Sequence, residues 1–163
     1  GLAFIGVSKK ALYRCENSNL PKYYFDYLLA KKYMDKKEPQ NPYTPAVSLI
    51  SAANEALQMI EKEGLQNVFL RHEKLASKFR EEIKNMGLKL YAQDHCYSNT
   101  VTAISFEEEG LASKIKDKLD KEYNIIISGG QGSTKGKLIR VGHMGCVNEE
   151  MIDKTLYAIR NSL

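Results

Sequence analysis

A glycine-rich segment is the part of the sequence whose composition is closest to a known binding motif. Residues 128–137 hold four glycines and end in Gly136 and a lysine. A phosphate-binding P-loop would need glycine where Gln131 stands and a hydroxyl residue where Leu138 stands. A dinucleotide-binding loop also fails, because Lys135 replaces its third glycine and a strand is expected next. By itself the segment predicts a glycine-rich hairpin loop.

Arg140 follows this segment and is the best candidate for a binding residue. It lies between Ile139 and Val141 in a short apolar run. Alternation along a strand would place its guanidinium on the face opposite those two side chains. One interpretation is an arginine on an edge strand, in contact with water. The other is an anion clamp, because the planar guanidinium can hold a carboxylate by two hydrogen bonds.

The other reactive residue types do not form a recognisable site. Their spacing matches no metal-binding motif, no nucleophile with its own base and no pair of carboxylates around one substrate. The histidines are His72, His95 and His143, and the cysteines are Cys15, Cys96 and Cys146. We expect no metal site, and we interpret the three cysteines as reduced thiols of a cytoplasmic protein.

Length and composition favour one domain, or one domain and part of another. The chain has 163 residues, of which 43% are hydrophobic and 27% charged, with a net charge of +4. Basic and acidic residues alternate in residues 114–122, which is typical of a solvated helix face. No apolar run reaches the ~20 residues of a membrane-spanning helix. We therefore expect no nucleic-acid or membrane partner.

The first 86 residues predict helices joined by a proline-containing connector. An apolar, strand-like run opens the chain, and Thr44 and Pro45 resemble the cap and first residue of a long helix. Gly87 is expected to end the helix before it in a left-handed conformation. The expected elements are a strand at 1–8, helices at 9–16 and 23–36, and two long helices at 45–63 and 65–86.

From residue 87 the hydrophobic period changes from 3.6 to 2, which predicts an α+β domain. Asn148 is expected to cap its last helix. The expected elements are strands at 88–91 and 100–106, a helix at 111–119, strands at 125–127 and 138–141, and a helix at 149–159. We expect a mostly antiparallel sheet with helices covering one face.

Five segments, in this order, resemble the C-terminal part of class V aminotransferases of the alanine–glyoxylate and serine–pyruvate type. They are residues 1–8, 43–49, 98–103, 127–132 and 137–145. The resemblance implies a fold-type I enzyme. It assigns 1–44 to the end of the large cofactor-binding domain and the connector, 45–86 to long connecting helices and 87–163 to the small C-terminal α+β domain.

The same resemblance implies roles for three residues. Arg140 is expected to bind the carboxylate of the amino or oxo acid substrate. Tyr43 and Thr44 match the stretch that reaches the phosphate of pyridoxal 5'-phosphate in the other subunit of a homodimer, and either hydroxyl could make that contact. The implied reaction moves an amino group between a small amino acid, alanine or serine, and an oxo acid, glyoxylate or pyruvate.

The lysine that binds the cofactor covalently in this family is expected a few residues before Gly1. We therefore expect the chain to be a fragment that is inactive alone. The alternative is a free-standing α+β module that binds an anion or a partner without catalysis. The apolar character of residues 2–7 favours the fragment, because an unpaired hydrophobic strand invites association.

Overall fold

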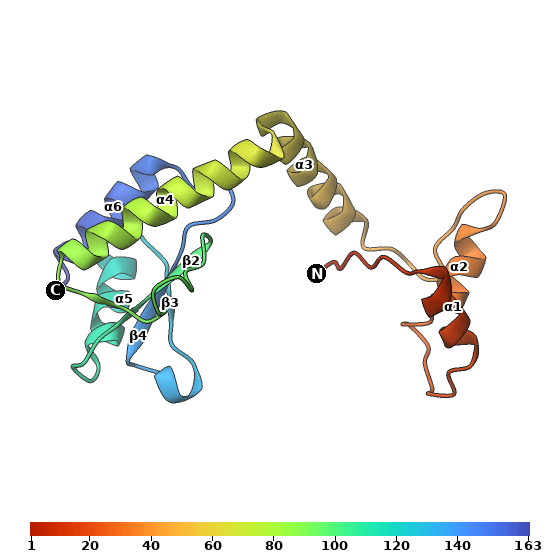
Figure 1. Ribbon diagram of the computed structural model, residues 1–163, viewed down its shortest axis with the longest axis horizontal. Coiled ribbons are helices and arrows are strands. Elements are labelled where there is room, and N and C mark those ends of the chain that lie inside the picture. The colour runs from red at the N-terminus through yellow and green to blue at the C-terminus, as the bar shows by residue number, and fades with distance from the viewer. The chain divides into compact units, whose positions relative to one another are not determined.

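Figure 1 shows the computed structural model of the protein, which describes residues 1–163. The chain divides into two compact units, Gly1–Lys62 and Glu63–Leu163. None of the helices combines the length and the apolar composition that crossing a bilayer would require.

The first unit contains α1 (Lys9–Glu16), α2 (Tyr27–Met34) and most of α3 (Val47–Glu63). The expected helix at 9–16 is confirmed, whereas the one expected at 23–36 is shorter. It begins at Tyr27 because the Asp26 carboxylate accepts the N–H groups of Leu28 and Leu29, at 3.0 and 3.1 Å. The expected strand at 1–8 is wrong, since a strand needs a neighbour for its backbone hydrogen bonds and residues 1–7 pair with none.

The two long helices are confirmed, with different boundaries. The first, α3, begins at Val47, so the prediction that Thr44 caps it is wrong. The Ile50 N–H instead donates to the Ala46 carbonyl, which makes Ala46 the start of the helical hydrogen bonding. In the second unit α4 spans Leu65–Asn85. Gly87 follows in the expected left-handed conformation, with φ of 76°.

The second unit has the expected α+β architecture. Four strands form an antiparallel sheet in the order β1-β2-β4-β3. The elements after α4 are β1 (Lys89–Leu90), β2 (Val101–Ser105), α5 (Leu111–Tyr123), β3 (Ser128–Gly129), a 3-10 turn (Gly132–Thr134), β4 (Leu138–Gly142) and α6 (Glu149–Arg160). Asn148 caps α6 as expected, by accepting the Met151 N–H at 2.9 Å.

The strand expected at 125–127 is displaced to β3. Asn124 adopts a left-handed conformation with φ of 54°, and the Ile125 N–H donates to the Leu119 carbonyl. These features close the C-terminus of α5. Pairing with β4 then begins only at Ser128, opposite Arg140.

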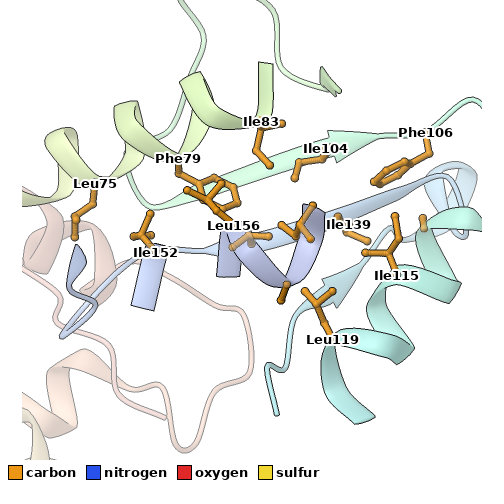
Figure 2. Packing of buried hydrophobic residues seen from close by; sticks show 14 residues of the cluster. Leu75, Phe79, Ile83, Ile104, Phe106, Ile115, Leu119, Ile139, Ile152 and Leu156 are labelled. Carbon is orange, nitrogen blue, oxygen red and sulfur yellow. The ribbon is translucent and has the colours of Figure 1, made fainter. Parts of the chain in front are cut away.

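One hydrophobic core holds the helices of this unit against one face of the sheet. Figure 2 shows labelled side chains of α4, α5, α6, β2 and β4 directed toward one another. The core includes Leu75, Phe79, Ile83, Ile104, Phe106, Ile115, Leu119, Ile139, Ile152, Leu156 and Ile159. The covered face is the one that carries Ile104 and Ile139, which are paired across β2 and β4.

Two polar side chains, Thr102 and His143, are buried in the same unit. The His143 Nε2 lies 2.8 Å from the Thr102 hydroxyl, and its Nδ1 lies 3.2 Å from the Asn99 carbonyl. Both ring nitrogens therefore have partners, as a buried imidazole requires. Burial lowers the pKa of His143, and the positive charge of Arg80 lowers it further.

The connection from β3 to β4 depends on a glycine at position 130. A Cβ atom there would lie 2.0 Å from the carbonyl oxygen of Thr134 and 2.6 Å from its carbonyl carbon. The Thr134 carbonyl lies there because the turn is closed locally: the Thr134 hydroxyl donates to the Gln131 carbonyl at 2.8 Å and accepts the Gln131 N–H at 3.0 Å.

We expect Gly130→Ala to lower the free energy of unfolding by about 1–3 kcal/mol, because the new methyl group meets backbone atoms that cannot move aside cheaply. Chemical denaturation measures this loss. Gly129→Ala is the matched control, since its Cβ would meet only the side chain of Lys116, at 4.0 Å. Equal losses in the two variants would contradict the proposed close approach.

Burial of His143 predicts a pH-dependent stability. Its folded-state pKa is below the usual 6.5. At a pH between the folded-state and the unfolded-state pKa, the unfolded chain therefore binds a proton that the folded chain does not. The contribution of neutral His143 to the free energy of unfolding is complete above about pH 6.5. It is lost as the pH falls from there through the folded-state pKa. Between about pH 7.5 and 5, the free energy of unfolding measured in urea should fall more for the wild type than for His143→Gln. The same loss in both would refute this assignment.

Candidate functional site

Arg140 lies in the interior of the sheet. Its strand, β4, pairs with β2 on one side and β3 on the other, so Arg140 opposes both Ala103 and Ser128. The interpretation as an edge-strand arginine is therefore wrong. Ile139 and Val141 are buried in the core, and the alternation of side chains directs Arg140 toward the opposite face, as expected.

The Arg140 guanidinium makes one hydrogen bond within the chain and has no acidic partner. Its Nε–H donates to the Gly129 carbonyl at 2.9 Å, and no carboxylate lies within 4.0 Å of its nitrogens. A guanidinium carries five N–H donors, and this bond uses one. Four N–H groups remain on Nη1 and Nη2. The forward-pointing N–H of each nitrogen together form an end-on fork that matches the two oxygens of a carboxylate.

Small residues surround Arg140 on this face of the sheet. Ala103 and Ser128 are its neighbours across the two ladders, and Gly142 is the next residue of β4 on the same face. Ala103 and Arg140 are half-buried, whereas Ser128 and Gly142 are exposed. The Met144 methyl group lies 3.5 Å from where a Cβ on Gly142 would be. Small side chains thus flank the guanidinium on this face of the sheet.

The glycine-rich segment uses many of its backbone N–H groups to close its own hairpin. The Gly130 N–H donates to the Leu138 carbonyl, the Thr134 N–H to the Gln131 carbonyl and the Lys135 N–H to the Gly132 carbonyl. Phosphate binding by a loop requires N–H groups that point at the ligand. The segment forms the predicted hairpin loop, and its carbonyl at Gly129 orients Arg140.

Tyr43 and Thr44 belong to the first unit and differ in how their hydroxyls are used. The Tyr43 hydroxyl donates to the Tyr23 carbonyl at 2.8 Å, and its ring lies 5.2 Å from the rings of Tyr23 and Tyr24. Burial raises the pKa of Tyr43, so this phenol remains a donor. Thr44 is exposed, and its hydroxyl takes part in none of the hydrogen bonds of its unit.

Three side chains of α4 that the sequence does not identify as functional hold the loops at one end of the sheet. Arg80 donates to the Ser98 carbonyl at 2.9 Å. Arg71 donates to the Gly145 carbonyl at 2.9 Å, and His72 accepts the Gly145 N–H at 3.0 Å. The partners are 18 to 74 residues apart in the chain, so no local pattern could have identified them.

A family model and several curated relatives match most of the chain. The family described as aminotransferase class-V matches residues 22–154. An uncharacterized aminotransferase of Methanocaldococcus jannaschii is 40% identical over 164 residues, which cover 100% of this chain and 42% of that protein. A serine–glyoxylate aminotransferase of Hyphomicrobium methylovorum is 35% identical over 168 residues, covering 100% of this chain and 40% of that protein.

A solved structure agrees with these relatives. The alanine–glyoxylate aminotransferase from Nostoc sp. has a TM-score of 0.85 and 28% identity, covering 95% of this chain and 42% of that one. The chain therefore spans about two fifths of the length of the proteins it matches. The family match covers most of the chain and includes Tyr43, Thr44 and Arg140. The chain belongs to the class-V aminotransferase family.

Proposed function

We propose that this chain is part of a pyridoxal-phosphate-dependent aminotransferase that moves an amino group between alanine or serine and glyoxylate or pyruvate. The observation that carries the proposal is the end-on fork of Arg140, which faces away from the core and has no carboxylate partner in the chain. Relatives named for serine–glyoxylate and alanine–glyoxylate transfer support this class of substrates.

The chain supplies part of this enzyme. We assign residues 1–44 to the end of the large domain and the connector, 45–86 to the connecting helices and 87–163 to the small domain. As the family resemblance implies, we expect the lysine that binds the cofactor to lie a few residues before Gly1. The chain spans about two fifths of the length of the relatives. We expect the chain alone to be inactive and the complete enzyme to be a homodimer.

The donor at Thr44 fits the phosphate end of pyridoxal phosphate, on which this family generally depends. When bound, that cofactor accepts the amino group from one substrate and delivers it to the other. The Thr44 hydroxyl is exposed and uncommitted, whereas that of Tyr43 donates to the Tyr23 carbonyl. Thr44 is therefore the better candidate for a hydrogen bond to the phosphate of the other subunit.

Arg140 would bind and orient the substrate. One N–H from Nη1 and one from Nη2 can hold the two carboxylate oxygens, while the bond from Nε–H to the Gly129 carbonyl restricts rotation of the guanidinium. A carboxylate held at two points presents the neighbouring carbon in one orientation, which lowers the entropic part of the barrier. The same contact serves the amino acid and the oxo acid, since both carry this carboxylate.

The complete protein, with cofactor bound, should transfer the amino group of alanine or serine to glyoxylate or pyruvate. We expect Arg140→Ala to lower kcat/KM for these amino acids by about 2–5 kcal/mol in transition-state free energy, roughly 30- to several-thousand-fold. Arg140→Lys should restore only part of it, because an ammonium group lacks the planar fork.

The control for this experiment is Arg160→Ala. Arg160 is exposed and pairs with Glu82 at 3.3 Å, so its loss should leave kcat/KM unchanged. A primary amine without a carboxylate provides a second comparison, which should react equally slowly with the wild type and Arg140→Ala. An Arg140→Ala enzyme that discriminates the amino acid from this amine as well as the wild type does would overturn the assignment.

Cofactor affinity tests the choice between Thr44 and Tyr43. Thr44→Ala removes a hydrogen bond to a charged group, which we expect to cost about 1.5–3 kcal/mol, or roughly 10- to 150-fold in the Kd of the cofactor. Thr44→Ser should retain most of the affinity. Equilibrium dialysis followed by cofactor absorbance measures these values. A larger loss in Tyr43→Phe than in Thr44→Ala would reverse the assignment.

A further inference from the structure

The turn that follows β4 is held by two imidazoles. It comprises residues 143–147 and starts three residues after Arg140. His72 belongs to α4 and contacts the turn across the fold, whereas His143 is a residue of the turn. The third histidine, His95, is exposed and takes part in no hydrogen bond. This contrast between histidines provides an internal comparison.

The hydrogen bonds of His72 define its tautomer. Its Nδ1 lies 2.7 Å from the Val68 carbonyl, which can only accept, so Nδ1 carries the proton and donates it. Its Nε2 lies 3.0 Å from the Gly145 N–H, which can only donate, so Nε2 accepts. Only the neutral ring with the proton on Nδ1 satisfies both contacts, because a second ring proton would face the N–H of Gly145.

His143 has the same tautomer. Its Nδ1 donates to the Asn99 carbonyl at 3.2 Å, which leaves Nε2 to accept from the Thr102 hydroxyl at 2.8 Å. The ring is fully buried and lies 5.9 Å from the Phe79 ring. Its backbone N–H donates to the Thr100 carbonyl at 2.9 Å. His143 thus joins the start of β2 to the end of β4.

Arg71 holds the same turn next to His72. It donates through Nη1 to the carbonyls of Gly145 and Val147, at 2.9 and 3.1 Å. Its Nε and Nη2 bind the two oxygens of Glu63, at 2.6 and 2.8 Å. These bonds from Arg71 lower the pKa of Glu63, so the carboxylate remains charged. Gly145 is therefore held at both its N–H and its carbonyl.

These contacts act on the strand that carries Arg140. The β2–β4 ladder pairs Ala103 with Arg140 and Val101 with Gly142, and the hydrogen bond between His143 and Thr100 extends it by one step. The ends of a ladder fray unless they are held. Fraying from the Val101–Gly142 end of the ladder would reach Arg140 after two residues. Shifts of less than an ångström in a binding group are enough to reduce activity.

We propose that His72 and His143 are positioning residues: as neutral rings protonated on Nδ1, they fix the turn 143–147 to α4 and β2 and thereby orient the Arg140 guanidinium toward the substrate carboxylate. This inference rests on the proposed role of Arg140. Both rings act through Arg140 and the backbone, and neither is assigned contact with the reacting atoms.

Kinetics of the complete, cofactor-loaded protein tests the orientation of Arg140. We expect His72→Leu to raise KM for the amino acid by about 10- to 100-fold, with kcat and cofactor Kd changed less than about twofold. His72→Gln should restore most of the affinity, because its amide oxygen reaches the position of Nε2 and can accept from Gly145. His95→Asn is the matched control and should behave as the wild type.

Nuclear magnetic resonance of the 163-residue chain tests the turn without using activity. Nitrogen-15 spectra should show His72 and His143 as neutral rings protonated on Nδ1, and His95 as a different tautomer mixture. The Gly145 amide should exchange with solvent about 10-fold or more faster in His72→Leu than in the wild type. Arg71→Lys is a second variant for the same measurement, because one ammonium group cannot bind Glu63 and both carbonyls in this geometry.

The outcomes separate this inference from the proposed function. Locked tautomers, faster Gly145 exchange and a raised KM in His72→Leu would support it. An unchanged KM in His72→Leu, while Arg140→Ala still loses substrate affinity, would overturn the positioning role and leave the function of Arg140 intact. Protonation on Nε2 in either ring would overturn the inference, because the hydrogen bonds assigned to that ring could not hold the turn. A failure of Arg140→Ala to affect substrate binding would refute the proposed function itself.

Discussion

Antiparallel pairing of β2 with β4 is the constraint on which the second unit depends. Its register opposes Ile104 to Ile139 and Ala103 to Arg140, and side chains alternate between faces along each strand. A slip of one residue would turn Ile139 outward and bury the charge of Arg140 in the core, which is costly without a partner. Burial of Ile139 therefore also keeps the guanidinium on the opposite face.

Helix α4 combines this packing with the support of the loops. Its apolar face places Phe79 and Ile83 in the core, while Arg71, His72 and Arg80 bind backbone groups of the loops before β2 and after β4. Because the core fixes the helix on the sheet, these side chains hold the loops relative to the strands. Substitution of one of these three side chains would therefore disturb the loops more than the packing of the core.

The two proposed binding contacts use donors in different ways. Arg140 offers a charged, planar fork that is restrained by the Gly129 carbonyl, which suits a carboxylate with two oxygens. Thr44 offers a neutral hydroxyl whose proton is not used within its unit, which suits one oxygen of a phosphate. Tyr43 has the same chemical group, but the Tyr23 carbonyl already accepts its proton. Prior hydrogen bonding thus distinguishes two residues that the sequence treats alike.

The sequence by itself determined the features that depend on neighbouring residues: the helices, the left-handed Gly87, the cap at Asn148 and the orientation of Arg140 in its strand. Hydrophobic period, capping and steric restriction act within a few positions, so they can be recognised locally. Tertiary structure decided that β4 is an interior strand, that pairing starts at Ser128 and that His72 and His143 hold one turn. These outcomes depend on hydrogen bonds between segments far apart in the chain, whose partners exist only after the core has brought them together.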